Sequence, residues 1–297
     1  MSLARRRALI AYGLLAPAVL LVAGWIVYPL AVVIDTSLRE GRARDIARLA
    51  QLPLGPANYL RALGDENVWS SALVTLGYVA GTVAPAFVLG LALALLLDRD
   101  FPGRRVVRSL MLMPWAVPGV VAAIAFLWMF NASYGVVNAV LRDLGLITTD
   151  IAWFTSGDTA LLAVVLPTAW KCFPFFVLTL LAALQAVPPE LHEAARVDGA
   201  GAWTGFRYVT WPSIRGAAAL AVVLQALWVT KEFDIIFTAT GGGPSRATQT
   251  LALFVYDEAF QFFRFGYAAA LGMLLLAVCA VLSVVSIAWS RPAAGAA

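Results

Sequence analysis

The sequence predicts an all-α integral membrane protein with six transmembrane helices. Apolar residues of the AVILMFWYC set make up 62% of the 297 residues, charged residues make up 13%, and the mean hydropathy is +0.84. A soluble domain is about 45–50% apolar and about 25% charged. The apolar residues also gather in stretches long enough to cross a bilayer, with charged residues between them. These observations exclude an ordinary soluble enzyme, a disordered tail and a disulfide scaffold.

Six apolar stretches of about 18 residues or more account for most of the chain. They cover approximately residues 9–34, 69–97, 108–131, 159–184, 213–237 and 265–289. The first stretch follows three arginines and reaches Ile34, which is too long for the apolar core of a secretory signal, so it predicts a retained helix. Because little sequence is left for a soluble domain, we expect one transmembrane domain over residues 1–297.

The distribution of arginines predicts the orientation of these helices. Six spans place both termini on one side of the membrane, together with loops 98–108 and 185–216. That side carries eleven arginines: Arg5, Arg6, Arg7, Arg99, Arg104, Arg105, Arg108, Arg196, Arg207, Arg215 and Arg291. The other side carries eight: Arg39, Arg42, Arg44, Arg48, Arg61, Arg142, Arg246 and Arg264. The bias favours cytoplasmic termini.

Several classes of function find no support in the residues. The net charge of +4 would suit nucleic acid, but the basic residues lie at the ends of spans, where orientation explains them better. Cys172 and Cys279 each lie inside a long apolar run, where cysteine behaves as a small hydrophobe. The single histidine, His192, lies in a polar loop, which leaves none for a catalytic triad or metal cluster in the core. We therefore expect no catalytic residue and no metal site.

The polar loop over residues 185–212 is long for a connection between two membrane helices. Its prolines suit a helix N-terminus, and Glu190 and Glu193 would lie in the first turns of that helix. Two glycines would then end it, a second short helix would cover residues 202–208, and Pro212 would begin the fifth span. The pattern predicts an amphipathic docking element on the cytoplasmic side. A solvated connector with helix-forming residues is the alternative.

This loop resembles the EAA loop of the membrane subunits of binding-protein-dependent ABC importers. The resemblance rests on Glu193-Ala194-Ala195, on Asp198-Gly199-Ala200 and on the ending Val209-x-Trp211-Pro212, where the family more often has Ile-x-Leu-Pro. It implies a coupling helix seated in a groove of a cytoplasmic ATPase, with Glu193 paired to a basic residue of that ATPase. The residues it assigns to coupling are Glu193, Ala194, Ala195, Val197, Asp198 and Gly199.

A second segment, from Glu232 to Pro244, resembles the one typical of maltose-type, carbohydrate-importing permeases. The turn Gly241-Gly242-Gly243-Pro244 within it lacks the Lys-Ser/Thr of a P-loop, so the chain itself is expected to bind no ATP or Mg²⁺. The resemblance covers about residues 10–290. It implies a sugar importer whose ATP and Mg²⁺ are held by a partner ATPase.

Two stripes of residues at helical spacing suggest where such a substrate would bind. Gln225, Trp228 and Glu232 follow one another at i, i+3 and i+7 in the fifth span. An amide, an aromatic face and a carboxylate suit a sugar, whose hydroxyls need hydrogen bonds and whose C–H faces stack on rings. Thr168, Cys172 and Phe175 form a second stripe in the fourth span. These six residues are the candidate substrate-binding residues.

Ionisable residues within the spans point to the same region as a substrate pathway. A charge inside a membrane is costly, so it usually marks a pathway or a buried ion pair. These ionisable residues are Lys171, Lys231, Glu232 and Asp234. Lys231 and Asp234 could instead pair along one helix, or the charges near its outer end could reach water.

The resemblance also implies the partners and the location of the chain. The partners are a second homologous permease, two ATPase subunits, an extracytoplasmic sugar-binding protein and membrane lipid, but no nucleic acid. The location is the inner (plasma) membrane of a prokaryote. A glycerol-phosphate-like or polyol substrate is the first alternative. An ion-coupled secondary transporter and a membrane scaffold without transport are alternatives from other classes.

Overall fold

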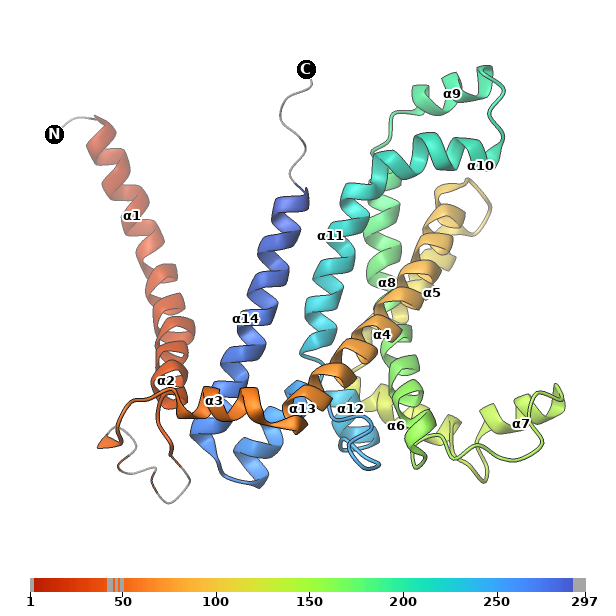
Figure 1. Ribbon diagram of the computed structural model, residues 1–297. Helices are drawn as coiled ribbons and strands as arrows, with labels where there is room; N and C mark the ends of the chain where they lie inside the picture. The colour runs from red at the N-terminus through yellow and green to blue at the C-terminus, as the bar shows by residue number, and fades with distance from the viewer. Residues whose placement is uncertain (1–2, 42–44, 46–47, 49–50, 291–297) are drawn as a thin grey trace. The chain divides into compact units, whose positions relative to one another are not determined.

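The computed structural model describes residues 3–41, 45, 48 and 51–290 and contains helices, turns and loops, with no strand in this described part (Figure 1). Its helices are α1 (Leu3–Val22), η1 (Ala23–Val27), α2 (Tyr28–Ser37), α3 (Ala57–Gly64), α4 (Glu66–Asp98), α5 (Arg104–Ala116), α6 (Gly119–Met129), α7 (Val136–Asp143), α8 (Gly157–Gln185), α9 (Pro189–Val197), α10 (Ala202–Gly205), η3 (Phe206–Thr210), α11 (Trp211–Thr230), α12 (Asp234–Ala239), α13 (Leu251–Tyr256), η4 (Asp257–Gln261) and α14 (Phe265–Ser290).

Five helical segments of the described chain are long and apolar enough to cross a membrane. Their bounds are Ala11–Ser37, Glu66–Asp98, Gly157–Gln185, Ala202–Thr230 and Phe265–Val284. A bent pair, α5 and α6, stands in the place of a sixth span. The all-α membrane class is therefore confirmed, and the spans predicted at 9–34, 69–97, 159–184 and 265–289 are each found within a few residues.

The chain divides into two compact units, Met1–Val68 with Val255–Ala277, and Trp69–Phe254 with Val278–Ala297. In the first unit, the Asn58 side-chain amide donates to the carbonyl oxygens of Ser37 and Arg39, each at 2.9 Å. Tyr59 shares a 2.7 Å hydrogen bond with the Ser37 hydroxyl. Gly266 lies so close to this turn that a Cβ there would stand 2.0 Å from the Arg39 carbonyl oxygen. These contacts join the end of α2, α3 and the start of α14.

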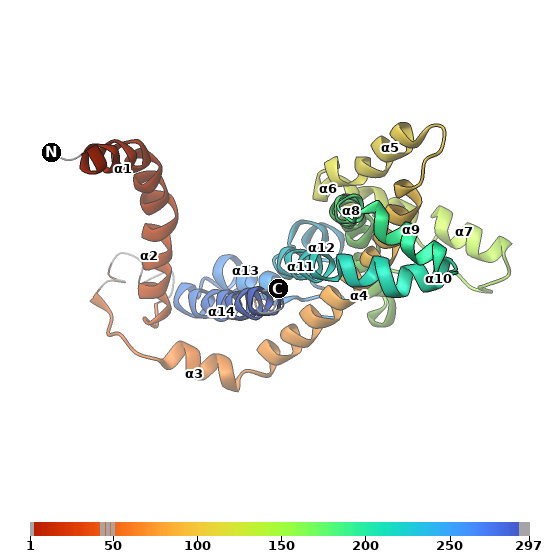
Figure 2. The same ribbon diagram turned by 90° about the horizontal axis from the view of Figure 1, so that it is seen from above.

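The second unit is built around α8, which contacts α5, α6, α11 and α12. Figures 1 and 2 both show α8 and α11 running side by side. The α4 helix approaches α8 at Gly90, where an added Cβ would lie 2.4 Å from the Phe176 Cβ. Small residues let membrane helices approach closely in this way. Phe176 is fully buried at this contact.

The third span is not the continuous helix that was predicted over residues 108–131. The α5 and α6 axes differ in direction by 97° across a break at Val117 and Pro118. Proline has no N–H and disfavours the helical conformation of the residue before it, and Val117 is accordingly extended, with ψ of 127°. The predicted apolar span is therefore present as a bent pair of helices, because this proline interrupts the helix within the apolar run.

The fifth span is displaced from its predicted position at 213–237. The short helix predicted over 202–208 is present as α10 and the start of η3, and it continues without a break into α11, so the whole helical segment runs from Ala202 to Thr230. A π-turn over Phe206–Thr210 precedes Pro212 and keeps the helix continuous where proline removes a backbone donor. The helix then ends at Thr230. Glu232 therefore lies beyond α11 rather than on one helical stripe with Gln225 and Trp228.

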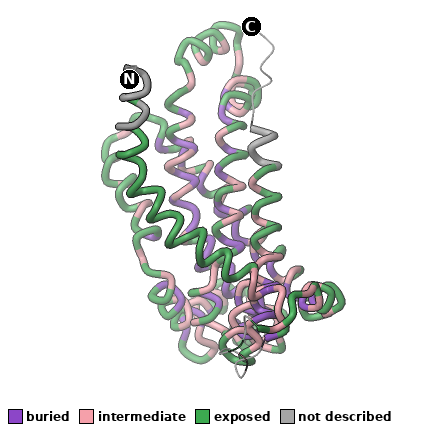
Figure 3. Tube along the Cα trace, turned by 90° about the vertical axis from the view of Figure 1, so that its left-hand side faces the viewer, coloured by how far each residue is buried: buried purple, intermediate pink, exposed green. Residues whose placement is uncertain are grey.

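The first span exposes its whole apolar surface. None of the most apolar window of Ala11–Ser37 is buried within the chain. In Figure 3 the helix that leads from the N-terminus is drawn as exposed along most of its described length. Lipid or another protein must cover this surface in a membrane.

Candidate functional site

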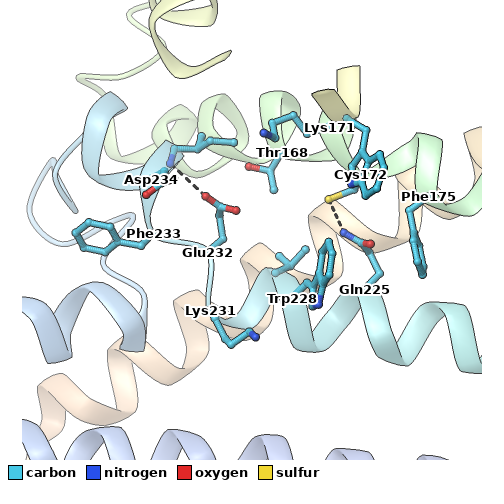
Figure 4. Close-up of a pocket in the computed structure, with 13 residues that line it drawn as sticks. Thr168, Lys171, Cys172, Phe175, Gln225, Trp228, Lys231, Glu232, Phe233 and Asp234 are labelled. Atoms are coloured by element: carbon cyan, nitrogen blue, oxygen red, sulfur yellow. Dashed lines mark hydrogen bonds between the residues drawn. The ribbon is translucent and has the colours of Figure 1, made fainter. Parts of the chain in front are cut away.

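A cavity of about 370 Å³ lies in the second unit, between α8, α11 and the connection from α11 to α12 (Figure 4). All six residues of the two predicted stripes line it, and they are Thr168, Cys172, Phe175, Gln225, Trp228 and Glu232. The structure thus brings both stripes together, although Glu232 reaches the cavity from the connection after α11. Trp115 from the end of α5 also lines the cavity.

Thr168 is held in one orientation by a residue outside the cavity. Its hydroxyl donates to the carbonyl oxygen of Val164 at 2.9 Å and shares a 2.6 Å hydrogen bond with the hydroxyl of Tyr78 on α4. Because the Thr168 proton is directed to Val164, Tyr78 is the donor to Thr168. One lone pair of the Thr168 oxygen remains, so Thr168 offers an acceptor to whatever occupies the cavity.

Replacing Thr168 with valine is expected to lower the stability of the protein by about 1–3 kcal/mol, because the fully buried Tyr78 hydroxyl would lose its partner. The measurement is the thermal unfolding midpoint in detergent. Thr168→Ser keeps the hydroxyl and should unfold near the wild-type temperature. The double variant Tyr78→Phe with Thr168→Val removes both polar groups and should recover part of the loss. Equal destabilisation by the single and double variants would contradict this hydrogen-bond assignment.

Gln225 and Cys172 face each other across α8 and α11 (Figure 4). The Gln225 amide nitrogen donates to the Cys172 sulfur at 2.7 Å, and both side chains are buried. The rings of Phe175 and Trp228 lie 6.4 Å apart with a tilt of 30°, and Trp228 remains 55% exposed. The cavity therefore has an aromatic wall beside its polar groups.

The charged residues of the region occupy two breaks between helices. A Glu232 carboxylate oxygen accepts the Ile235 N–H at 3.3 Å and caps the first turn of α12. The Lys171 ammonium donates to the Val117 carbonyl oxygen at the break between α5 and α6. Both groups line the cavity. Lys231 and Asp234 form no ion pair with each other in the described chain, because Lys231 ends one helix and Asp234 begins the next.

The candidate coupling residues lie on a helical hairpin formed by α9 and α10 (Figures 1 and 2). Glu193, Ala194 and Val197 are exposed on the outer face of α9, with Val197 88% exposed. Ala195 belongs to the opposite face and lines a second cavity. Gly199 follows the helix at φ +81°, and the next N–H, of residue 200, donates to the Ala195 carbonyl oxygen at 2.9 Å. Asp198 is the C-terminal cap of α9.

Sequence reasoning missed Tyr78, Trp115 and the contact of Lys171 with the break at Val117. Tyr78 lies on α4 and Trp115 on α5. The spacing of apolar residues along a helix does not reveal which other helices pack against it. Pro118 was the one available signal, since a proline in an apolar run marks a possible break.

Comparison with known proteins identifies the family. Residues 86–292 match the family model described as the binding-protein-dependent transport system inner membrane component. The chain belongs to this family. The protein is therefore a permease of the ABC transporters, a transport component of the inner membrane.

The permease has relatives that match it over most of its length. It is 35% identical to the trehalose/maltose transport system permease protein MalF of Thermococcus litoralis, over 85% of this chain and 84% of that protein. It is 37% identical to the sulfoquinovosyl glycerol transport system permease protein SmoG of Agrobacterium fabrum, over 91% and 86%. It is 34% identical to the trehalose transport system permease protein SugA of Mycobacterium tuberculosis, over 96% and 89%.

A solved structure shows the same fold. A chain of a bacterial ABC transporter involved in the import of the acidic polysaccharide alginate superposes with a TM-score of 0.82 at 20% identity, and 97% of each chain is covered. The importer permease fold is thus shared over nearly the whole chain.

Proposed function

We propose that the permease is a subunit of an ATP-driven, binding-protein-dependent importer of a sugar or oligosaccharide, and that it forms half of the translocation pathway. The observation that carries this proposal is the cavity in which an amide, a hydroxyl, two carboxylates, two ammonium groups and four aromatic side chains converge. Sugar hydroxyls need donors and acceptors, and sugar C–H faces stack on rings. Relatives named for trehalose, maltose and sulfoquinovosyl glycerol transport support the same class of substrate.

In this proposal the substrate contacts Gln225, Trp228, Glu232, Thr168, Cys172 and Phe175. Thr168 accepts a hydrogen bond from a sugar hydroxyl, because its own proton is committed to Val164. Trp228, which is half exposed and tilted against Phe175, offers a ring face to the sugar. A phosphate would be favoured by an excess of positive charge, but Lys171 and Lys231 share the cavity with two carboxylates, those of Glu232 and Asp234, so the lining carries no net positive charge.

The α9 helix is the coupling element of this proposal. Glu193, Ala194 and Val197 share an exposed face that can enter a groove of a cytoplasmic ATPase, with Asp198 and Gly199 ending the helix. Ala195, on the opposite face, would connect the motion to the rest of the permease. ATP and Mg²⁺ would be bound by two ATPase subunits and not by this chain. A short rigid helix can pass ATPase closure to the spans as rigid-body motion.

A second permease, two ATPases and an extracytoplasmic sugar-binding protein would complete the importer, with both termini cytoplasmic. The structural relatives support partners of this kind, since one is a bacterial alginate ABC transporter in complex with an alginate pentasaccharide-bound periplasmic protein. The unburied first span supplies surface for a second permease and for lipid. Residues 1–297 would then act as one transmembrane domain of the assembly.

The test is ATP hydrolysis by the complete transporter in lipid, with and without its binding protein, across a panel of sugars, polyols and glycerol phosphates. Stimulation by one sugar, only when the binding protein is present, is the expected result. Stimulation by a glycerol phosphate or a polyol would assign the alternative substrate class. Uptake by the isolated permease without any ATPase would overturn the proposal in favour of a secondary transporter.

A further inference from the structure

A second cavity of about 960 Å³ lies beneath the α9–α10 hairpin, between the end of α4 and the start of the fifth span. On α4 it is lined by one stripe of residues at helical spacing, namely Val88, Leu91, Ala92, Leu95, Asp98 and Arg99. The facing wall consists of Ala202, Trp203, Gly205, Phe206 and Thr210. We call this cavity the α4 groove.

The length of the α4 groove along the axis of α4 is close to the thickness of one leaflet of a bilayer. Val88 and Arg99 are eleven residues apart in sequence, which corresponds to about 16 Å along the helix axis. The hydrocarbon region of one leaflet is about 15 Å thick. Arg99 directly follows the last residue of the span Glu66–Asp98, so the groove runs along the last three turns of this span.

The mouth of the α4 groove is basic and aromatic. Arg99 and Arg196 line it together with one carboxylate, Asp98, and neither arginine forms an ion pair with any described residue. Trp203 is 74% exposed there and stacks on Phe206 with ring centroids 5.8 Å apart. Tryptophan prefers the headgroup level of a membrane, and arginines attract anionic headgroups.

Small residues keep the α4 groove open. A Cβ added at Gly201 or Gly205 would meet no atom within 4 Å, and Ala92 and Ala202 bring only methyl groups. The apolar walls of Val88, Leu91 and Leu95 on one side and Phe206 on the other therefore leave room for a hydrocarbon chain.

We propose that the α4 groove binds one anionic phospholipid, with an acyl chain along α4 and its phosphate on Arg99 and Arg196. The lipid comes from the leaflet in which α4 ends. The lipid would contact and stabilise the α9–α10 hairpin, because Ala195, Arg196 and Ala200 of the hairpin line the groove. This inference depends on the groove alone and stands whichever substrate the permease transports.

The test uses the complete transporter, reconstituted in phosphatidylcholine vesicles with or without phosphatidylglycerol and then re-extracted in detergent. Retained phospholipid is identified by native mass spectrometry. The wild type should retain phosphatidylglycerol in preference to phosphatidylcholine. The double variant Arg99→Gln with Arg196→Gln should retain it roughly 30-fold more weakly, as expected from the loss of two basic residues at a membrane surface. The double variant Arg207→Gln with Arg215→Gln, an equal loss of charge outside the groove, should retain it as the wild type does.

A second variant tests the apolar part. At Gly205 an added Cβ would meet no atom within 4 Å, so Gly205→Leu directs its side chain into open space and should abolish retention of either phospholipid. Unchanged retention in both Gly205→Leu and the double arginine variant would overturn the proposal. A cysteine introduced by Ala92→Cys distinguishes the occupants. Protection of this cysteine from a membrane-soluble maleimide by the ATPase subunits in lipid-free detergent would assign the groove to protein and overturn the lipid site.

Discussion

Replacing Glu193 with arginine is expected to reduce substrate uptake by roughly tenfold or more while the transporter still assembles. In the coupling role that we propose for α9, Glu193 pairs with a basic residue of the ATPase, and the charge reversal would turn this attraction into repulsion. Glu193 lies on the exposed face of α9 with Ala194 and Val197, and its side chain makes no ion pair with any described residue. The fold of the permease itself should therefore tolerate the change. Uptake into vesicles and ATP hydrolysis, measured on the same preparation, report coupling.

The control for this variant is Asp143→Arg, the same charge reversal at an exposed residue of another helix, α7. It changes the net charge equally but lies outside the docking face of α9, so uptake should stay near the wild-type rate. Hydrolysis that continues without uptake in Glu193→Arg would demonstrate uncoupling. If Glu193→Arg transported normally, or if both variants lost uptake equally, the assignment of α9 as the coupling helix would be wrong.

Replacing Gly90 with valine is expected to separate α4 from α8 and to destabilise the permease by about 3 kcal/mol or more. Even the Cβ alone would stand 2.4 Å from the Phe176 Cβ and 3.2 Å from the Phe173 carbonyl oxygen, and both residues belong to the buried face of α8. Neither atom can rotate away, since one is backbone and the other is bonded to it. The measurement is the thermal unfolding midpoint together with the yield of monodisperse protein in detergent.

Gly81 provides the matched control on the same helix. A Cβ at Gly81 would lie 3.4 Å from a Val165 methyl group, which is an ordinary contact. Gly81→Ala should therefore be neutral or slightly stabilising, because alanine favours a helix by about 1 kcal/mol over glycine. A Gly90→Val protein as stable as Gly81→Ala would show that α4 does not approach α8 as closely as described.

The residues of the cavity were predictable in part. Thr168, Cys172 and Phe175 share one face of α8 because α8 is a regular helix, so periodicity alone placed them correctly relative to one another. Glu232 reaches the same cavity by a different route from the predicted one. The α11 helix ends at Thr230, earlier than the apolar run suggested, so Glu232 lies after it. The Glu232 carboxylate caps α12 instead of extending a stripe on α11.

Other features required knowledge of which helices are neighbours. Tyr78 orients Thr168 across a separation of ninety residues, and Lys171 reaches the carbonyl of Val117 at the break in another helix. The α4 groove likewise combines the end of α4 with a hairpin far along the chain. A hydrophobic pattern reports that a helix has a buried face, but not which helix covers it.

The sequence by itself determined the membrane class, the approximate bounds of four spans, the family resemblance around Glu193 and six of the residues that line the first cavity. These features depend on local hydrophobicity and on residue order, which the chain carries directly. Only the tertiary structure decided the 97° bend between α5 and α6, the end of α11 at Thr230 and the two cavities. Those features arise where backbone groups released by a helix break find partners on other helices, and close approach at residues such as Gly90 decides which helices these are.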